Sequence, residues 1–332
     1  MIAPSDSPSP DQRPGFRAAG LIADCPETGG FAASSPPGGA LPITRTSVDG
    51  DVVKFCQRTG DGHEIESVVV PMGGEIQGRD KTWRTLCVSS QIGCARECAF
   101  CQTGRMGLIR NLTVEEIVGQ VEAARTQLGA NVRNVVFMGM GEPLDNFDNV
   151  VAAIRRWHED REHQIPRRRV TVSTAGRCEG IRRLAALRWR RLNLAVSLNA
   201  PNDEIRSLLM PINRREPMAM LREAIAVYPV RAGGHVLIEY VLIKGLNDQP
   251  GHAGQLIEYL RGLRTCVNLI PFNPCAGLPY EAPDEETAAR FQVQLMEAGQ
   301  MAFRRNTKGQ QAMAACGQLG KPAALRSNGG HK

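Results

Sequence analysis

The sequence predicts an α/β fold, a partial barrel of about six βα units built on a mostly parallel sheet. Two observations support this prediction. Short apolar runs alternate with helical stretches from residue 84 to residue 305, as is typical of right-handed βαβ units. The cysteine- and glycine-containing motifs directly follow predicted strands, where parallel α/β folds bind their ligands.

Six short runs rich in aliphatic and β-branched residues are predicted to be strands. They cover residues 84–89, 132–138, 169–173, 192–197, 236–242 and 267–270. Helices are predicted at about 146–158, 177–188, 217–227, 252–263 and 284–299. Another helix should begin after Thr113, because Thr113 and Glu116 have the spacing of a capping box and apolar residues follow at helical spacing.

Composition divides the chain into four parts. Residues 1–42 contain eight prolines and six glycines and are predicted to be a disordered tail. We expect residues 43–83 to form a short extension that packs on the core, residues 84–320 to form the core, and residues 321–332 to be a flexible tail.

The composition also argues against membrane insertion and secretion. The chain has 332 residues, a formal net charge of +6 and 42% hydrophobic residues, which is enough for a core. Its longest apolar runs, such as 236–243, are too short to span a bilayer, and the amino terminus lacks the apolar stretch of a signal peptide. We expect a cytoplasmic protein whose ten cysteines include metal ligands or catalytic thiols.

Cys94, Cys98 and Cys101 form the strongest motif in the sequence. Three thiolates at spacings of four and three residues can surround one metal centre from a single loop. A [4Fe–4S] cluster bound by three cysteines keeps one iron open, whereas structural zinc sites need four protein ligands. A zinc site completed by a remote histidine and three unrelated buried cysteines are the alternatives.

This C-x₃-C-x₂-C motif, with Phe100 before its last cysteine, resembles the radical S-adenosylmethionine superfamily. The resemblance implies a [4Fe–4S] cluster whose open iron binds S-adenosylmethionine and cleaves it to a 5′-deoxyadenosyl radical. The glycine-rich run 138–143 permits close backbone approach to a ligand, and its Glu142 could accept hydrogen bonds from a cationic amine. Taken alone, this run could also be an ordinary turn.

Further motifs narrow the resemblance to the RlmN/Cfr family of radical RNA (adenine) methyltransferases. They lie in order between residues 64 and 319, at 87–94, 138–143, 172–176, 197–203, 269–274 and 314–319. The resemblance implies methylation of an adenosine in RNA, most simply at carbon 2 in 23S ribosomal or transfer RNA. Carbon 8 stays open, because both reactions use the same cysteine pair.

The resemblance also implies a role for each matching residue. Cys316 would take a methyl group from a first S-adenosylmethionine, a second would supply the radical, and Cys87 would release the product by forming a disulfide with Cys316. Glu66 matches the proton acceptor. The positions that would bind S-adenosylmethionine are Gly141, Glu142, Ser173, Ser197, Leu198, Asn199 and Asn273.

Other interpretations of these residues are structural. Cys316 and Cys87 could be small buried side chains, and Glu66 a solvated carboxylate at a strand end. The chemistry nonetheless needs such a set: adenine carbon 2 is electron-poor, a carbon radical can add there, and a base must then remove a proton. The remaining cysteines, at positions 25, 56, 178, 266 and 275, match no motif and are expected to be structural.

Charge points to a nucleic-acid partner. Twelve arginines and only four acidic residues lie between residues 151 and 191, and Arg304, Arg305 and Lys308 precede Cys316. Clustered arginines suit phosphate contacts, although solvated helix faces with ordinary ion pairs would give the same count. We expect RNA as the partner, a flavodoxin or ferredoxin as the electron donor, and a monomer.

The sequence departs from the family in three places. Little sequence precedes Glu64, an extra stretch 73–81 separates Glu66 from Cys87, and Asn199 stands where histidine is common. Two rival functions remain: a radical enzyme with another RNA position or a non-RNA substrate, and a non-catalytic iron–sulfur RNA-binding module.

Overall fold

The computed structural model describes residues 40–72, 75–76, 79–80, 83–160, 164–305, 309 and 312–320. Nearly all of the predicted amino-terminal tail, the carboxyl-terminal tail and most of the stretch 73–81 lie outside these residues. The described residues contain one ten-stranded sheet, in the order β1-β2-β3-β6-β9-β10-β11-β12-β13-β14.

Seven strands of this sheet are parallel and confirm the predicted α/β fold. They are β6 (Trp83–Cys87), β9 (Val132–Phe137), β10 (Val170–Thr174), β11 (Asn193–Ser197), β12 (Val236–Leu242), β13 (Thr265–Pro271) and β14 (Ala302–Arg304). The edge strands β1 and β14 are not hydrogen-bonded to each other within the described residues, so the barrel is partial.

Three antiparallel strands continue the sheet at its amino-terminal side. They are β1 (Ile43–Asp49), β2 (Val52–Arg58) and β3 (Glu64–Met72), and β3 pairs with β6 so that Val68 lies opposite Cys87. The sequence pattern does not predict that this segment joins the sheet. Four shorter strands form two separate pairs: β4 (Glu75–Ile76) with β5 (Arg79–Asp80), and β7 (Gln91–Gly93) with β8 (Leu108–Asn111).

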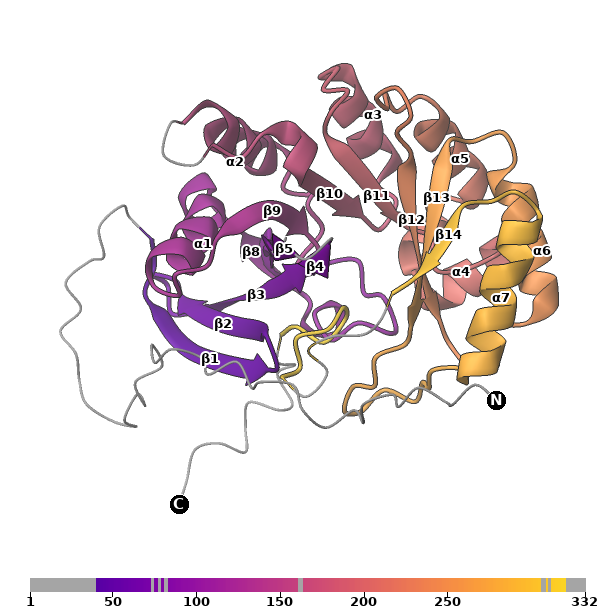
Figure 1. Cartoon of the computed structure of the whole chain (residues 1–332), viewed down its shortest axis with the longest axis horizontal. Coiled ribbons are helices and arrows are strands. Elements are labelled where there is room, and N and C mark those ends of the chain that lie inside the picture. The colour runs from indigo at the N-terminus through magenta and orange to yellow at the C-terminus, as the bar shows by residue number, and fades with distance from the viewer. Residues whose placement is uncertain are drawn as a thin grey trace, which may run out of the picture. The chain divides into compact units, whose positions relative to one another are not determined.

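The helices lie in an arc outside the strands (Figure 1). They are α1 (Val114–Thr126), α2 (Phe147–Glu159), α3 (Cys178–Ala186), α4 (Asp203–Leu209), α5 (Met218–Ala226), α6 (Pro250–Leu260) and α7 (Glu285–Glu297). The predicted capping box of α1 is present: the Glu116 amide donates to Thr113 Oγ1 and the Thr113 amide to Glu116 Oε2. The short helix α4 was not predicted. No helix of the described residues is long and apolar enough to cross a membrane.

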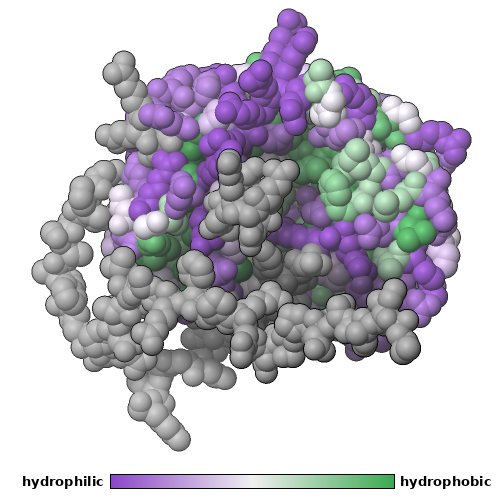
Figure 2. Space-filling model, viewed as in Figure 1, coloured by the Kyte–Doolittle hydropathy of each residue, from purple (hydrophilic) through white to green (hydrophobic). Residues whose placement is uncertain are grey.

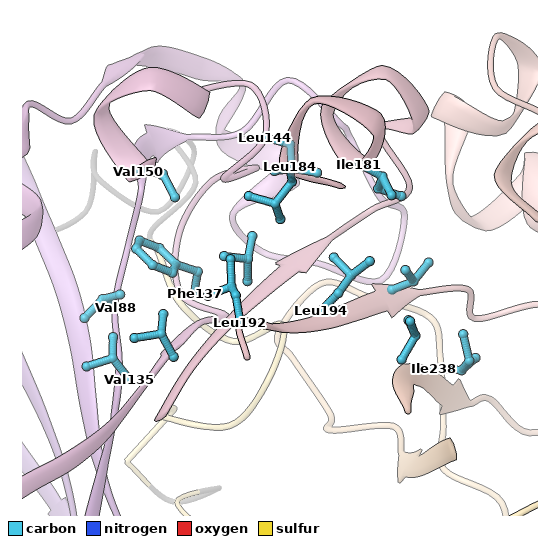
Figure 3. Close-up of a cluster of buried hydrophobic side chains, with 14 of the residues drawn as sticks. Val88, Val135, Phe137, Leu144, Val150, Ile181, Leu184, Leu192, Leu194 and Ile238 are labelled. Atoms are coloured by element: carbon cyan, nitrogen blue, oxygen red, sulfur yellow. The ribbon is translucent and has the colours of Figure 1, made fainter. Parts of the chain in front are cut away.

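The main core fills the space between the sheet and its helices. Figure 3 shows Leu194 of β11 pointing toward Ile181 of α3, and the ring of Phe137 of β9 on the side of Val150 of α2. Trp157 of α2 is fully buried there, with its ring 5.7 Å from that of Phe137. On the surface seen in Figure 2, hydrophilic side chains surround scattered hydrophobic ones. Because the helices and this core cover the outer face of the sheet, its inner face is left for the site.

We expect Trp157→Ala to lower the free energy of unfolding by about 3–5 kcal/mol, because it removes a fully buried indole and leaves a cavity. Chemical denaturation measures this loss. Val227→Ala, at a position that is 62% exposed, is the control and should change little. Equal stabilities of the two variants would contradict this account of the core.

Candidate functional site

Residues 94–103, which include Cys94, Cys98 and Cys101, form the three-cysteine loop. This loop follows β7, near the carboxyl ends of the parallel strands. The Cys94 amide donates to the Gly107 carbonyl at 2.9 Å, and the Cys101 amide donates to the Cys98 carbonyl at 3.1 Å. Gly93 has a φ of +76°, and a Cβ there would lie 1.8 Å from the Gly107 oxygen. The loop can therefore close over itself only with glycine at this position.

Cys94, Cys98 and Cys101 all line one cavity. Burial raises the pKa of each thiol, that of Cys94 to about 12, so a cation in the cavity is needed to stabilise the thiolates. Within the described ranges no three His, Cys, Asp or Glu side chains converge as ligands of one metal ion. In a [4Fe–4S] cluster each thiolate binds a different iron, so these separated thiols fit a cluster better than a zinc site.

The same cavity, of about 160 Å³, is lined by residues from five parallel strands, β9 to β13, and from the loops that follow them. Six of the seven residues expected to bind S-adenosylmethionine line it: Gly141, Glu142, Ser173, Ser197, Asn199 and Asn273. Leu198 is the exception, since its side chain is fully buried in the core between the sheet and the helices. Gly141 has a φ of +98°, and a Cβ there would lie 2.5 Å from Cβ of Gln91.

Glu142 connects the loops that follow β9 and β10. Its Oε1 accepts from the Leu144 amide at 3.0 Å and its Oε2 from the Ala175 amide at 2.7 Å. Burial raises the pKa of Glu142 to about 7, while these two amides lower it. Carboxylate oxygens have two lone pairs each, so both retain capacity for a cationic amine in the cavity.

Asn199 is held in an unusual backbone conformation. Its φ is +57°, its Oδ1 accepts from the Val241 amide at 2.9 Å, and its carbonyl accepts from Asn247 Nδ2 at 2.8 Å. Asparagine tolerates the left-handed region better than most residues. The position where histidine was expected is therefore filled by a residue that holds the loop after β11 to β12.

Cys316 lies in a segment, 312–320, that is tied to the three-cysteine loop. The Gln102 amide donates to the Gly317 carbonyl at 2.8 Å, and Thr103 Oγ1 donates to the Leu319 carbonyl at 2.6 Å. On the other side, Gln318 Nε2 donates to the Pro274 carbonyl at 2.9 Å and Asn273 Nδ2 to the Cys316 carbonyl at 3.3 Å. These bonds hold the Cys316 thiol at the wall of the cavity.

Cys87 and Cys316 share a second cavity, on the inner face of the sheet. Both are free thiols, as are all nine described cysteines, so no disulfide joins them in this state. Burial, together with the nearby Cys316, raises the pKa of Cys87 to about 12, and the charge of Arg305 opposes this shift.

Arg305 lies in the candidate site, in a contact that the sequence did not reveal. It was expected to bind RNA together with Arg304 and Lys308, but its Nη1 lies 3.6 Å from Cys316 Sγ. Arg304 pairs with Glu285 instead, and Lys308 lies outside the described residues. The sequence offered one indication that Arg305 belongs to the site: it directly follows a parallel strand, as other site residues do.

Glu66 is buried, 3% exposed, but lines neither cavity. Its Oε2 lies 3.6 Å from Lys54 Nζ and accepts from the Gly320 amide at 3.2 Å. Lys54 also donates to the Met313 carbonyl at 3.1 Å. The pair therefore contacts both ends of the segment that carries Cys316.

Comparisons with known proteins agree with this geometry. The Radical SAM superfamily profile matches residues 88–256. The chain is 48% identical over 282 residues to the probable dual-specificity RNA methyltransferase RlmN 1 of Protochlamydia amoebophila, covering 84% of this chain and 76% of that protein. It is 42% identical over 313 residues to the dual-specificity RNA methyltransferase RlmN of Geobacter sulfurreducens, covering 94% and 82%.

A solved structure is also similar. The radical SAM methyltransferase from Sphaerobacter thermophilus is 43% identical and superposes with a TM-score of 0.77, covering 84% of this chain and 80% of that one. The region matched by the superfamily profile includes the three-cysteine loop.

We expect Cys87 to react with iodoacetamide at least about tenfold more slowly than Cys316 at about pH 8, because only the thiolate is nucleophilic. The pKa of Cys87 is raised, so its rate should climb as the pH rises toward that value. Peptide mass spectrometry of anaerobically labelled protein measures both rates, and denatured protein is the control. Equal rates in the folded protein would show that Cys87 is not the more protected thiol.

Proposed function

Because the chain belongs to the RlmN family of radical S-adenosylmethionine RNA methyltransferases, we propose that it methylates carbon 2 of an adenosine in 23S ribosomal or transfer RNA. One observation carries this proposal: Cys316 borders both the cavity with the three-cysteine loop and the cavity that contains Cys87. A thiol in that position can receive a methyl group from one side and meet a base and a second thiol on the other.

The residues of the first cavity would hold a [4Fe–4S] cluster and S-adenosylmethionine. Cys94, Cys98 and Cys101 would bind the cluster, and Gly141, Glu142, Ser173, Ser197, Leu198, Asn199 and Asn273 would bind S-adenosylmethionine, Leu198 through its backbone. When bound, this pair supplies a 5′-deoxyadenosyl radical. Two S-adenosylmethionine molecules would be used in each turnover, one as methyl donor and one as radical source.

Cys316 would act first as a nucleophile. Its thiolate attacks the sulfonium methyl group, forming an S–CH₃ bond while S-adenosylhomocysteine leaves. Arg305 would help to position this sulfur, since its Nη1 lies 3.6 Å from Cys316 Sγ. After the 5′-deoxyadenosyl radical has taken one hydrogen atom from this methyl group, the S-bound carbon would add to the adenine ring and form a covalent protein–RNA link. The adduct would then have to lose a proton and one electron, and the bound cluster would be the available electron acceptor.

Cys87 would end the reaction. Its sulfur attacks the Cys316 sulfur, the bond between Cys316 and the transferred carbon breaks, and that carbon takes up a proton to become the methyl group. A Cys87–Cys316 disulfide forms as the methylated RNA leaves, and reducing that disulfide needs an external thiol or dithiol. Burial gives Cys87 a high pKa, which the charge of Arg305 partly offsets, so this thiol has to lose its proton before it can attack.

Glu66 would accept the proton that restores aromaticity. Glu66 is two residues before Val68 on β3, and Val68 pairs with Cys87 on β6. In this structure, however, the Glu66 carboxylate accepts a hydrogen bond from the Gly320 amide. Proton transfer to Glu66 therefore needs the segment 312–320 to shift away from it. We also propose that the enzyme is a cytoplasmic monomer that takes its electron from a flavodoxin or ferredoxin.

The test is mass spectrometry of nucleosides from RNA treated with the reconstituted enzyme. Ribosomal and transfer RNA fractions come from cells without an enzyme of this family, and the reaction is anaerobic with S-adenosylmethionine and reductant. We expect 2-methyladenosine in at least one fraction. The 8-methyl isomer would correct the position, and 5′-deoxyadenosine without methylated RNA would refute the substrate.

Variants of the two thiols separate the steps. We expect Cys316→Ala to abolish methyl transfer while leaving 5′-deoxyadenosine formation possible, because the carrier sulfur is lost but the first cavity is intact. Cys87→Ala should trap protein covalently bound to RNA, seen as a slow-migrating band in denaturing gels. Cys266→Ala, at a buried cysteine outside both cavities, is the control. Normal methylated product from either site variant would overturn the proposed roles.

A further inference from the structure

The arginine-rich segment separates into two groups in the structure. Five of its arginines have a carboxylate within 4.0 Å and are largely neutralised: Arg156, Arg167, Arg177, Arg182 and Arg183. Others form no ion pair with a described carboxylate, among them Arg168 and Arg169. Arg133, just before the segment, is also unpaired in this sense and lies over the Trp83 ring.

The unpaired group lies at the amino-terminal edge of the sheet. Arg133 is the second residue of β9, Arg168 and Arg169 directly precede β10, and the Arg168 carbonyl accepts from Asn193 Nδ2 at the start of β11. Burial and the charges of Arg133 and Arg168 lower the pKa of Arg169. Guanidinium groups that repel one another are stabilised by a bound polyanion.

The second cavity connects this edge with Cys316. Its volume is about 330 Å³, and it shares six residues with the first cavity: Met138, Glu239, Ile270, Asn273, Cys316 and Leu319. On two strands its lining lies nearer to the amino-terminal edge, with Thr171 rather than Ser173 on β10 and Leu237 rather than Val241 on β12. Closed α/β barrels fill this level with packed side chains, whereas here it is open.

Two apolar side chains mark the mouth of this cavity. Phe303 on β14 is 51% exposed and Met72 on β3 is 40% exposed, and both line the cavity. In the sheet, β3 and β14 flank the parallel strands β6 to β13 on opposite sides. Exposed apolar side chains beside a charged surface indicate a binding site. An aromatic ring is a suitable platform for an unpaired nucleobase.

From this juxtaposition we propose that RNA docks on the amino-terminal edge of the sheet. Its phosphates contact Arg133, Arg168 and Arg169, and the target base passes Phe303 into the second cavity. It then reaches Cys316 from the side opposite the cofactor-binding residues. Enzymes that react with a base withdraw it from the helical stack. This inference rests on the proposed function and adds to it the docking surface and the direction of access.

The test compares two double variants that lose the same charge. The variant Arg168→Ala/Arg169→Ala removes two arginines of the unpaired group. The control Arg182→Ala/Arg183→Ala removes two ion-paired arginines on α3. Holoenzyme is titrated with unmodified transfer RNA and with ribosomal RNA at several salt concentrations. Methylation kinetics and RNA-independent 5′-deoxyadenosine formation are measured alongside.

We expect the edge variant to bind RNA at least about tenfold more weakly and to reduce the salt slope by about 2, one unit for each lost phosphate contact. Its KM for RNA should rise while RNA-independent cofactor cleavage stays unchanged. The control should match the wild type. Phe303→Ala should raise KM without changing the salt slope, since it removes no charge.

The outcomes separate the two levels of the proposal. If the wild type methylates RNA and the edge variant behaves like the control, RNA docks elsewhere and this inference is wrong. Equal losses in both double variants would show an effect of net charge alone, which also overturns it. If the wild type neither binds nor methylates any RNA, the proposed function itself fails.

Discussion

The site depends on the hydrogen bonds that hold the segment 312–320 against the three-cysteine loop. In the proposed reaction, the Cys316 sulfur carries a methyl group between reaction partners that lie on different sides of it. Bonds from Gln102 and Thr103 on one side and Gln318 on the other fix that sulfur between two cavities. Without them the parallel sheet would still form, but its two cavities would share no reactive atom.

A second set of contacts ties the same segment to the antiparallel strands. Lys54 on β2 bonds to Met313, and Glu66 on β3 bonds to Gly320. The strands that extend the sheet thus serve as the platform for the carboxyl-terminal segment. Motion of Cys316 from methyl donor to base has to break or lengthen contacts of this kind, since packed contacts rearrange between discrete states.

Local signals made much of this architecture predictable. The strand at 236–242 has the expected bounds because a buried parallel strand is a continuous apolar run. The three cysteines could be found because their spacing lies within one loop. In contrast, the contact between Glu66 and Gly320 joins residues 254 positions apart. The position of Arg305 after a strand indicates a site residue, but it does not identify Cys316 as the side chain that Arg305 contacts. Pairing of β3 with β6 is non-local as well, so the sheet's extension could not be predicted.

The bond between the Gln102 amide and the Gly317 carbonyl joins main chain to main chain. Any residue except proline can donate from position 102. Position 317 is more restricted, because its φ of +84° favours glycine and a Cβ there would lie 3.3 Å from the Phe100 carbonyl oxygen. A side chain at position 317 would therefore strain the anchor that holds the neighbouring sulfur, whereas most substitutions at position 102 would leave the bond in place.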